Sequence, residues 1–244
     1  MPANSPGTVL VTGAGRRLGQ CIALDFARRG WRVAAHHRDS AKGAEDLVSE
    51  IRRSGGEAAA IQADLLSADA PDQLLKACAE KLGPVTCLVN NAAQYEWDSL
   101  QTLSLKSWDD HMALNLRAPV FLAQAFAAQL PEGAKGVVIN ILDQKVWRLN
   151  PAFFSYTVAK SALWTATQLM AQELAPRIRV NAVGPGPVFQ SRHQSEADFR
   201  AECDATLLGE VISPAQICDA IRLLVETPSL TGQMIAVDSG QHLT

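Results

Sequence analysis

Short runs of apolar, β-branched residues alternate along this chain with longer segments in which apolar residues recur every three or four positions. The first pattern is typical of buried strands, and the second is typical of helices that pack by one face. This alternation predicts an α/β fold: a doubly wound parallel sheet of the Rossmann type, flanked by helices on both faces. Strands are expected at residues 8–12, 31–36, 57–62, 86–90, 136–142, 179–183 and 234–237, and helices near residues 17–29, 41–53, 71–81, 107–129, 154–175 and 214–226.

Residues 1–244 are expected to form one domain. This length can bury a full core, and no internal repeat, low-complexity tract or linker interrupts the alternation. Residues 189–212 differ, because they are polar and show no clear periodicity. A long irregular connection of this kind is often a mobile loop over a binding site. We therefore expect a substrate loop at 189–212, with a solvated connection as the alternative.

Composition excludes several classes of function. The formal net charge is −3 at neutral pH, so no basic surface for nucleic acid is expected. The most apolar helix, residues 118–130, is too short to span a membrane, and residues 1–6 lack the charged and apolar blocks of a signal peptide. The five cysteines are scattered without metal-ligand spacing. These features predict a cytoplasmic protein with reduced thiols and no metal, which acts on a small molecule without nucleic acid or membrane partners.

A glycine-rich turn follows the first predicted strand and opens the first predicted helix, over residues 12–19. Glycines let the backbone bend sharply, and they let a pyrophosphate approach the amides of the helix N-terminus, where the helix dipole favours anions. The glycine spacing is one residue longer than the usual Gly-x-Gly-x-x-Gly. A structural turn without a ligand is the alternative. The residues expected to bind a cofactor here are Gly13, Gly15, Arg17, Leu18 and Gly19.

The choice of cofactor depends on residues 36–40, at the end of the second predicted strand. An acidic residue there binds a ribose diol, whereas a cation accepts a 2′-phosphate. Arg38 can grip a phosphate and Arg17 could reach the same place, which favours NADP(H), while Asp39 keeps NAD(H) open. Asp64, after the third strand, could bind the adenine amino group or cap the next turn. The expected contacts at this end are His37, Arg38 and Asp64, although histidines placed here more often pack or form hydrogen bonds than catalyse.

Tyr156 and Lys160 lie four residues apart on one face of a predicted helix, and Asp143 stands thirteen residues before the tyrosine. A nearby ammonium favours the phenolate, so Lys160 is expected to lower the pKa of Tyr156 toward the working pH. A general acid is most useful in that range. The trio therefore indicates proton delivery to a group that receives hydride.

Several short motifs occur together with this trio. They are Thr12-Gly13 with Gly19, Asp64, Asn90-Asn91-Ala92, Asn115, residues 179–183, Gly184-Pro185-Gly186 and Val237-Asp238-Ser239-Gly240. With them the chain resembles the short-chain dehydrogenase/reductase family over essentially its whole length. The resemblance implies a single doubly wound domain that exchanges hydride with a nicotinamide cofactor. Members usually form tetramers through the two long helices and the last strand, so a homotetramer is expected.

The resemblance also implies roles for single residues. Lys160 would hold the nicotinamide ribose and tune Tyr156, and Asn115 would order a water in a proton relay. Asn91 and Ala92 would lie beside the adenosine ribose. The residues that would line the nicotinamide are Pro185, Gly186 and Val188.

Two positions depart from the usual family pattern. Arg17 stands where the family usually has glycine, and Asp143 stands where it usually has serine. A serine hydroxyl donates a hydrogen bond to a carbonyl oxygen, whereas an ionised aspartate only accepts. The aspartate charge would also raise the pKa of Tyr156 and oppose Lys160. Asp143 therefore suits a substrate rich in N–H donors, or a proton shared with Tyr156.

Both departures occur together in the pteridine reductase branch, which includes dihydromonapterin and related dihydropteridine reductases. That branch is also similar in its aromatic residue just after Asn-Asn-Ala, which here is Tyr95 and could stack a flat heterocycle. Some pterin reductases use a serine in this loop, where this chain has Ala93 and Gln94. Residues that could extend the aromatic pocket, or simply pack, are Trp97, Trp147, Phe153 and Phe189.

The leading hypothesis is an NADPH-dependent reductase that transfers hydride to a C=N bond of a dihydropterin or dihydrofolate. A short-chain carbonyl or alcohol oxidoreductase, acting on a ketone or a 3-oxoacyl group, is the alternative, and Asp143 counts against it. A non-catalytic dinucleotide-binding protein is a third interpretation, against which the retained catalytic motif counts. The expected catalytic residues are Asn115, Asp143, Tyr156 and Lys160, and the expected substrate contacts are Tyr95, Asp143 and Tyr156.

Overall fold

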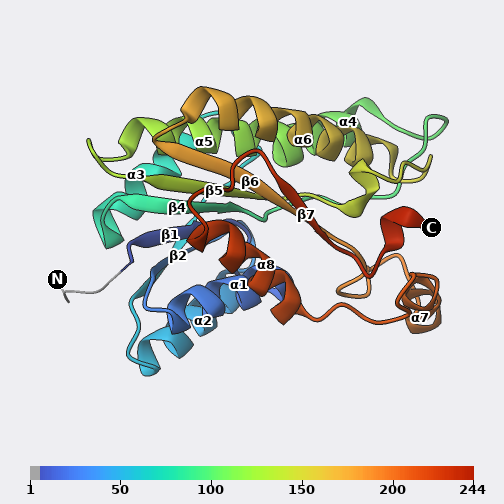
Figure 1. Cartoon of the computed structure of the whole chain (residues 1–244), viewed down its shortest axis with the longest axis horizontal. Coiled ribbons are helices and arrows are strands. Elements are labelled where there is room, and N and C mark those ends of the chain that lie inside the picture. Colours follow the sequence, from blue (N-terminus) through green and yellow to red (C-terminus); the bar gives the residue numbers. More distant parts are fainter. Residues whose placement is uncertain (1–5) are drawn as a thin grey trace.

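The computed structural model describes residues 6–244 and places seven parallel strands in one sheet, in the order β3-β2-β1-β4-β5-β6-β7 (Figure 1). The predicted sheet is therefore confirmed, with strand ends that differ from the predicted ones by a few residues at most. Residues 1–5, which we expected to carry no leader, lie outside the described residues. The strands are β1 Thr8–Val11, β2 Arg32–His37, β3 Ala58–Gln62, β4 Val85–Asn90, β5 Gly136–Ile141, β6 Ile178–Pro185 and β7 Met234–Val237.

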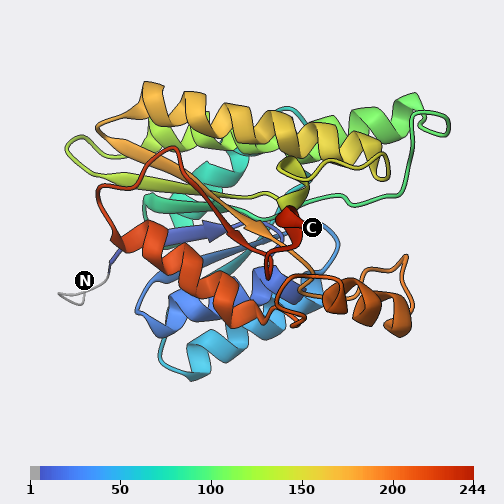
Figure 2. The same ribbon diagram turned by 45° about the vertical axis from the view of Figure 1, so that its right-hand side comes forward.

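Helices cover both faces of the sheet, as a doubly wound fold requires (Figures 1 and 2). The helices α1 (Arg17–Arg28), α2 (Ala41–Arg53) and α8 (Pro214–Glu226) bury their apolar residues in one core cluster with one face of the strands. The opposite face is covered by α3 (Ala70–Leu82), α5 (Ala118–Gln129) and α6 (Phe154–Leu174), with α4 (Leu105–Met112) packed beside α6. No helix within residues 6–244 combines the length and the apolar character needed to cross a bilayer.

Two predicted segments need correction. The expected helix at 107–129 begins earlier, at Leu105, where the Ser104 hydroxyl accepts a hydrogen bond from the Ser107 N–H at 3.1 Å, and a π-helical turn, Ala113–Arg117, separates α4 from α5. Residues 189–212 are not irregular throughout, because they contain α7, Glu196–Asp204. Cys203 is the one buried residue of α7, so the helix has too little apolar repeat to be recognised by periodicity. Its capping box, between Ser195 and Asp198, was the available signal.

The strand order reverses between β1 and β4, so the connections on the two sides run to opposite faces of the sheet. Crevices for ligands form at such a switch point, outside the carboxyl ends of the strands. The connection from β4 to α4 and the segment that contains α7 both extend beyond this edge (Figures 1 and 2). The fold therefore gathers residues from several loops at one place.

A buried chain of amides fixes the strands that carry these loops. The Asn90 amide on β4 donates to the Asn140 Oδ1 on β5 at 2.8 Å, and the Asn140 amide donates to the Thr167 hydroxyl on α6 at 2.8 Å. All three side chains are buried. Buried polar groups are stabilising only when they are paired, so this chain sets one register between β4, β5 and α6.

We expect Asn140→Leu to lower the free energy of unfolding by about 1–3 kcal/mol, because it deprives Asn90 and Thr167 of their shared partner. Urea unfolding measures the change. Thr167→Val alone should also lower the free energy of unfolding. The double variant should lose less free energy than the sum of the two single losses, because both single changes break the same hydrogen bond. Additive losses would show that Asn140 and Thr167 do not act as a unit.

Candidate active site

A cavity of about 1020 Å³ lies at the carboxyl edge of the sheet. It extends from the glycine turn after β1 to the segment after β6. Most of the residues selected from the sequence meet here, although they come from seven separate stretches of chain. Those that line the cavity are Gly13, Arg17, Leu18, Gly19, Arg38, Asp64, Asn91, Ala92, Tyr95, Asp143, Tyr156, Lys160, Pro185, Gly186 and Val188.

The glycine turn is held in place from two sides. The Gly13 N–H donates to His36 Nδ1 at 3.1 Å, and the Asn91 amide donates to the Thr12 carbonyl at 2.8 Å. Burial lowers the pKa of His36 to about 4, so the ring is neutral and can accept this bond. A Cβ at Gly19 would lie 2.2 Å from the Gly13 carbonyl oxygen, so no other residue fits there. The first turn of α1 has no side-chain cap, which leaves its N–H groups available to an anion.

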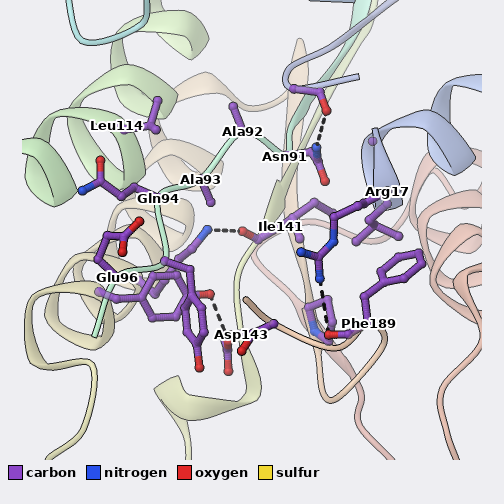
Figure 3. Close-up of a pocket in the computed structure, with 18 of the residues that line it drawn as sticks. Arg17, Asn91, Ala92, Ala93, Gln94, Glu96, Leu114, Ile141, Asp143 and Phe189 are labelled. Carbon is purple, nitrogen blue, oxygen red and sulfur yellow. Dashed lines mark hydrogen bonds between the residues drawn. The ribbon is translucent and has the colours of Figure 1, made fainter. Parts of the chain in front are cut away.

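Arg17 occupies the position where the family usually has glycine, and its backbone has a φ of 52°. A left-handed conformation favours glycine, so the arginine is held here at some cost. Its guanidinium donates to the Phe189 carbonyl at 3.3 Å (Figure 3). It also donates to the Gln190 carbonyl at 2.9 Å and lies 5.3 Å from the centre of the Phe189 ring. In this structure Arg17 thus binds the segment after β6 across the cavity, and its contact with a 2′-phosphate beside Arg38 stays a prediction.

Arg38 and Asp64 lie at the far end of the cavity. The Arg38 guanidinium forms an ion pair with Asp39 at 2.6 Å, and nearly half of its side-chain surface remains exposed. One Asp64 oxygen caps the following turn by accepting the Leu66 N–H at 3.0 Å. Because Asp64 also lines the cavity, the capping and ligand-binding interpretations of this residue are compatible.

Three of the residues predicted to be catalytic, Asp143, Tyr156 and Lys160, lie together in the structure. The Tyr156 hydroxyl donates to Asp143 Oδ2 at 2.9 Å, and the other carboxylate oxygen accepts the Lys145 N–H at 2.8 Å. The Lys160 ammonium donates to the Ile141 carbonyl at 2.6 Å and lies 5.7 Å from the centre of the Tyr156 ring. Figure 3 shows Asp143 and Ile141 at the strand end from which both contacts are made. Asp143 therefore faces the tyrosine and not bulk solvent.

Electrostatics in the trio differ from one of our expectations. The pKa of Tyr156 is raised well above its usual value, first by burial and then by the charge of Asp143. The prediction that Lys160 lowers the pKa of Tyr156 is therefore wrong, whereas the opposing effect of Asp143 is confirmed. Burial also raises the pKa of the Asp143 carboxyl, and it lowers the pKa of Lys160 to about 8. The pair of acids thus retains its protons more readily than exposed groups would.

Asn115 lies outside the cavity lining, in the π-helical turn. Its side chain is fully buried and pairs twice with the backbone of Gln94, accepting from the N–H and donating to the carbonyl, both at 2.9 Å. This pairing fixes the loop after β4, on which Asn91, Ala92 and Tyr95 stand. The side chain of Asn115 thus holds the loop in place, and its expected part in a water relay stays a prediction. Gly15 and His37 also lie outside the lining, in buried positions.

Tyr95 belongs to an aromatic wall. Its ring stacks on Phe153 with 4.1 Å between ring centres, and it meets the Tyr156 ring edge-on at 4.8 Å. Phe189 lines the cavity at the other side, whereas Trp97 and Trp147 are largely exposed and lie outside the lining. Of the four additional aromatic residues considered, Phe153 and Phe189 therefore contribute to the surroundings of the cavity.

The segment at 189–212 closes the cavity from one side. Arg192 forms an ion pair with Glu96, which lies on the loop after β4. Glu202 of α7 accepts from the Gln194 amide at 2.6 Å and from the Gln241 amide at 3.1 Å. This segment thus covers the site as a substrate loop would, and the loop role itself remains a prediction.

Sequence reasoning missed several lining residues, among them Arg16, Glu96, Gln144, Gln194, Glu202 and Gln241. Apart from Arg16, they belong to no recognised motif. Arg16 had a usable signal, because it stands within the glycine turn. The others reach the cavity only through the packing of the loops, which the spacing of residues along the chain does not show.

Comparisons with known proteins agree with this geometry. A family model described as short chain dehydrogenase matches residues 7–200. A 3-oxoacyl-[acyl-carrier-protein] reductase of Synechocystis sp. is 33% identical, with 98% of each chain covered.

Two solved structures are more similar in sequence. FolM alternative dihydrofolate reductase 1 from Brucella canis, complexed with NADP, is 43% identical at a TM-score of 0.96, with 98% of this chain and 95% of that chain covered. The corresponding Brucella suis protein, also in complex with NADP, is 44% identical at a TM-score of 0.95, covering 100% and 97%.

The depressed pKa of Lys160 predicts a pH effect on stability. Between about 8 and the ordinary value of 10.5 the unfolded chain binds more protons at this residue than the folded chain does. Stability therefore rises with pH in that window, and relative to Lys160→Met it should rise by up to about 1.4 kcal/mol per pH unit. Urea unfolding of both proteins at a series of pH values measures the difference. A difference that does not change with pH would mean that the folded lysine titrates normally.

Proposed function

The chain belongs to the short-chain dehydrogenase family, and from this premise we propose that it is an NADPH-dependent reductase that delivers hydride to a C=N bond of a pteridine-type substrate. Membership makes it an oxidoreductase. The substrate class is the part that needs an argument from the site, because the named relatives reduce different groups. The observation that carries the proposal is the 2.9 Å hydrogen bond between Tyr156 and Asp143.

The residues present fit the proposed cofactor. Gly19 keeps the turn open because a Cβ there would strike the backbone, and the uncapped first turn of α1 offers N–H groups to a pyrophosphate. Arg38, with much of its guanidinium exposed, would accept a 2′-phosphate. Bound NADPH supplies the hydride. The two Brucella proteins, whose structures are described as complexes with NADP, also support NADP(H) as the cofactor.

Asp143 favours a nitrogen substrate over a carbonyl. An ionised carboxylate cannot donate a hydrogen bond to a ketone oxygen, but it accepts readily from ring N–H groups. The oxygen that accepts from Tyr156 belongs to a group whose pKa is raised by burial, so this aspartate holds a proton nearer to neutral pH than an exposed one. Asp143 can therefore accept hydrogen bonds from N–H donors when it is ionised, and it can share its proton with Tyr156 when it is protonated.

The reaction needs one hydride and one proton. When hydride reaches the carbon of a C=N bond, the nitrogen gains a pair of electrons and takes up a proton, so the product carries C–H and N–H bonds. Tyr156 and Asp143 supply that proton from their shared hydrogen bond, and Lys160 keeps a positive charge beside the phenol ring. Tyr95, stacked on Phe153, offers a flat wall that orients a bicyclic ring.

Reduction of a 3-oxoacyl carbonyl is the second candidate. The name of the Synechocystis relative favours it, at 33% identity over almost the whole chain. Asp143 counts against this second candidate, because it stands in place of the donor that a carbonyl oxygen requires. A non-catalytic role is opposed by the intact contacts of Tyr156 and Lys160.

A panel of dihydropterins, dihydrofolate, quinones, ketones and a 3-oxoacyl thioester tests the proposal by NADPH oxidation. We expect wild-type turnover with the pteridines, a fall of about a hundredfold or more in Tyr156→Phe, and loss of pteridine turnover in Asp143→Ser. NADPH affinity, measured by fluorescence, should be retained in Asp143→Ser and serves as the control. Undiminished pteridine reduction by Asp143→Ser would remove the reason for preferring this substrate, and an unchanged rate in Tyr156→Phe would refute its role as the acid.

We also propose that the protein forms a homotetramer through its two long helices and last strand. Phe121 on α5 and Leu169 on α6 support this, because each large apolar side chain is about half exposed on the described surface. Sedimentation velocity measures the assembly, and Leu169→Glu should shift it toward smaller species. A wild-type chain that sediments as a monomer at micromolar concentration would contradict the proposal.

A further inference from the structure

Gln144 carries an unpaired amide in the wall of the cavity. The residue directly follows Asp143, begins the 3₁₀ turn Gln144–Val146 and is only 2% exposed. It lines the cavity, yet its Oε1 is buried without a hydrogen-bond partner, and its amide bonds to no other side chain or backbone group within residues 6–244. A buried amide that nothing in the protein satisfies is costly unless a ligand pairs with it.

Two other glutamine side chains of the same wall have partners. The Gln194 and Gln241 amides both donate to Glu202, at 2.6 and 3.1 Å, and Gln194 Oε1 also accepts the Ser191 N–H at 3.1 Å. These residues hold the loop after β6 and the C-terminal turn together. Gln144 takes no part in this arrangement, so its amide is not needed to join segments of the fold.

The chemistry beside Gln144 limits what could pair with it. Asp143 offers carboxylate oxygens, which accept hydrogen bonds, and an amide offers both N–H donors and a carbonyl acceptor. Tyr95 supplies a flat aromatic face at the same end of the cavity. A flat heterocycle whose edge alternates N–H and C=O groups matches this set, whereas a ketone or an acyl thioester carries no such edge.

We propose that Gln144 binds the 2-amino-4-oxo edge of the pyrimidine ring of a pteridine and so determines specificity for that ring. This inference rests on the proposed function and names the residue that selects its substrate class. Rotation of the amide by half a turn lets Gln144 meet either a ring N–H through Oε1 or the ring carbonyl through its N–H groups. In both orientations the amide atom in the buried position, Oε1 or the nitrogen, gains the partner that the protein does not provide.

A ligand cycle tests the assignment. Pterin and its parent pteridine, which lacks the 2-amino and 4-oxo groups, are titrated into the NADP⁺ complexes of the wild type and of Gln144→Met. We expect the substitution to weaken pterin binding by about tenfold and to leave pteridine binding unchanged, because only the first ligand has groups for the amide. Gln144→Leu, a second apolar replacement, should behave in the same way if Gln144→Met fails to fold.

Two further readouts separate ligand binding from a structural role. NADP⁺ affinity should be unchanged, and the thermal midpoint of the protein without pterin should stay the same or rise, since an apolar side chain removes an unpaired amide. A lowered midpoint together with equal losses for both ligands would show that Gln144 is a packing residue and overturn the proposal. Wild-type protein that binds pterin as tightly as Gln144→Met does would overturn the Gln144 assignment alone, whereas wild-type protein that binds no pterin at all would overturn the proposed function with it.

Discussion

Burial of a carboxylate against a phenol is the constraint on which this site depends. Asp143 and Tyr156 share a 2.9 Å hydrogen bond in the cavity wall, where Tyr156 is buried and Asp143 is half-buried, and Lys160 holds the only ammonium of the trio beside them. Desolvation moves all three pKa values in the direction that favours the neutral forms. Tyr156 and Asp143 therefore keep their protons more readily than exposed groups do, beside a lysine whose pKa is lowered to about 8.

The scaffold serves this pair by fixing three elements at once. Asp143 follows β5, Tyr156 and Lys160 stand on α6, and the loop with Tyr95 follows β4. The buried bonds from Asn90 through Asn140 to Thr167 join the same three elements inside the core. Asn115 extends this control to the loop by pairing with the backbone of Gln94. The relative positions of Asp143, Tyr156 and Tyr95 are thus set by buried amides that lie outside the cavity lining.

Much of this could be predicted from the sequence, because strand and helix periodicities and the spacing of Tyr156 and Lys160 are local properties. What failed depends on three-dimensional packing. The direction of the pKa of Tyr156 follows from burial, which outweighs the lysine and cannot be read from spacing. Arg17 turns toward Phe189 because the segment after β6 folds back over the turn. Helix α7 buries too few residues to show a period, and an unpaired amide such as that of Gln144 is visible only when every neighbour has been placed.

The contacts that hold the segment after β6 over the cavity have a consequence for exchange of ligands. Arg17 holds this segment by hydrogen bonds to its backbone carbonyls, and Arg192 of the segment forms an ion pair with Glu96. Both guanidinium groups are exposed, and an ion pair in such surroundings is worth less than about 1 kcal/mol. These two contacts therefore contribute little to holding the segment in place. The ion pair between Arg192 and Glu96 also weakens as salt screens it. Rising ionic strength should therefore shorten the residence time of a bound ligand.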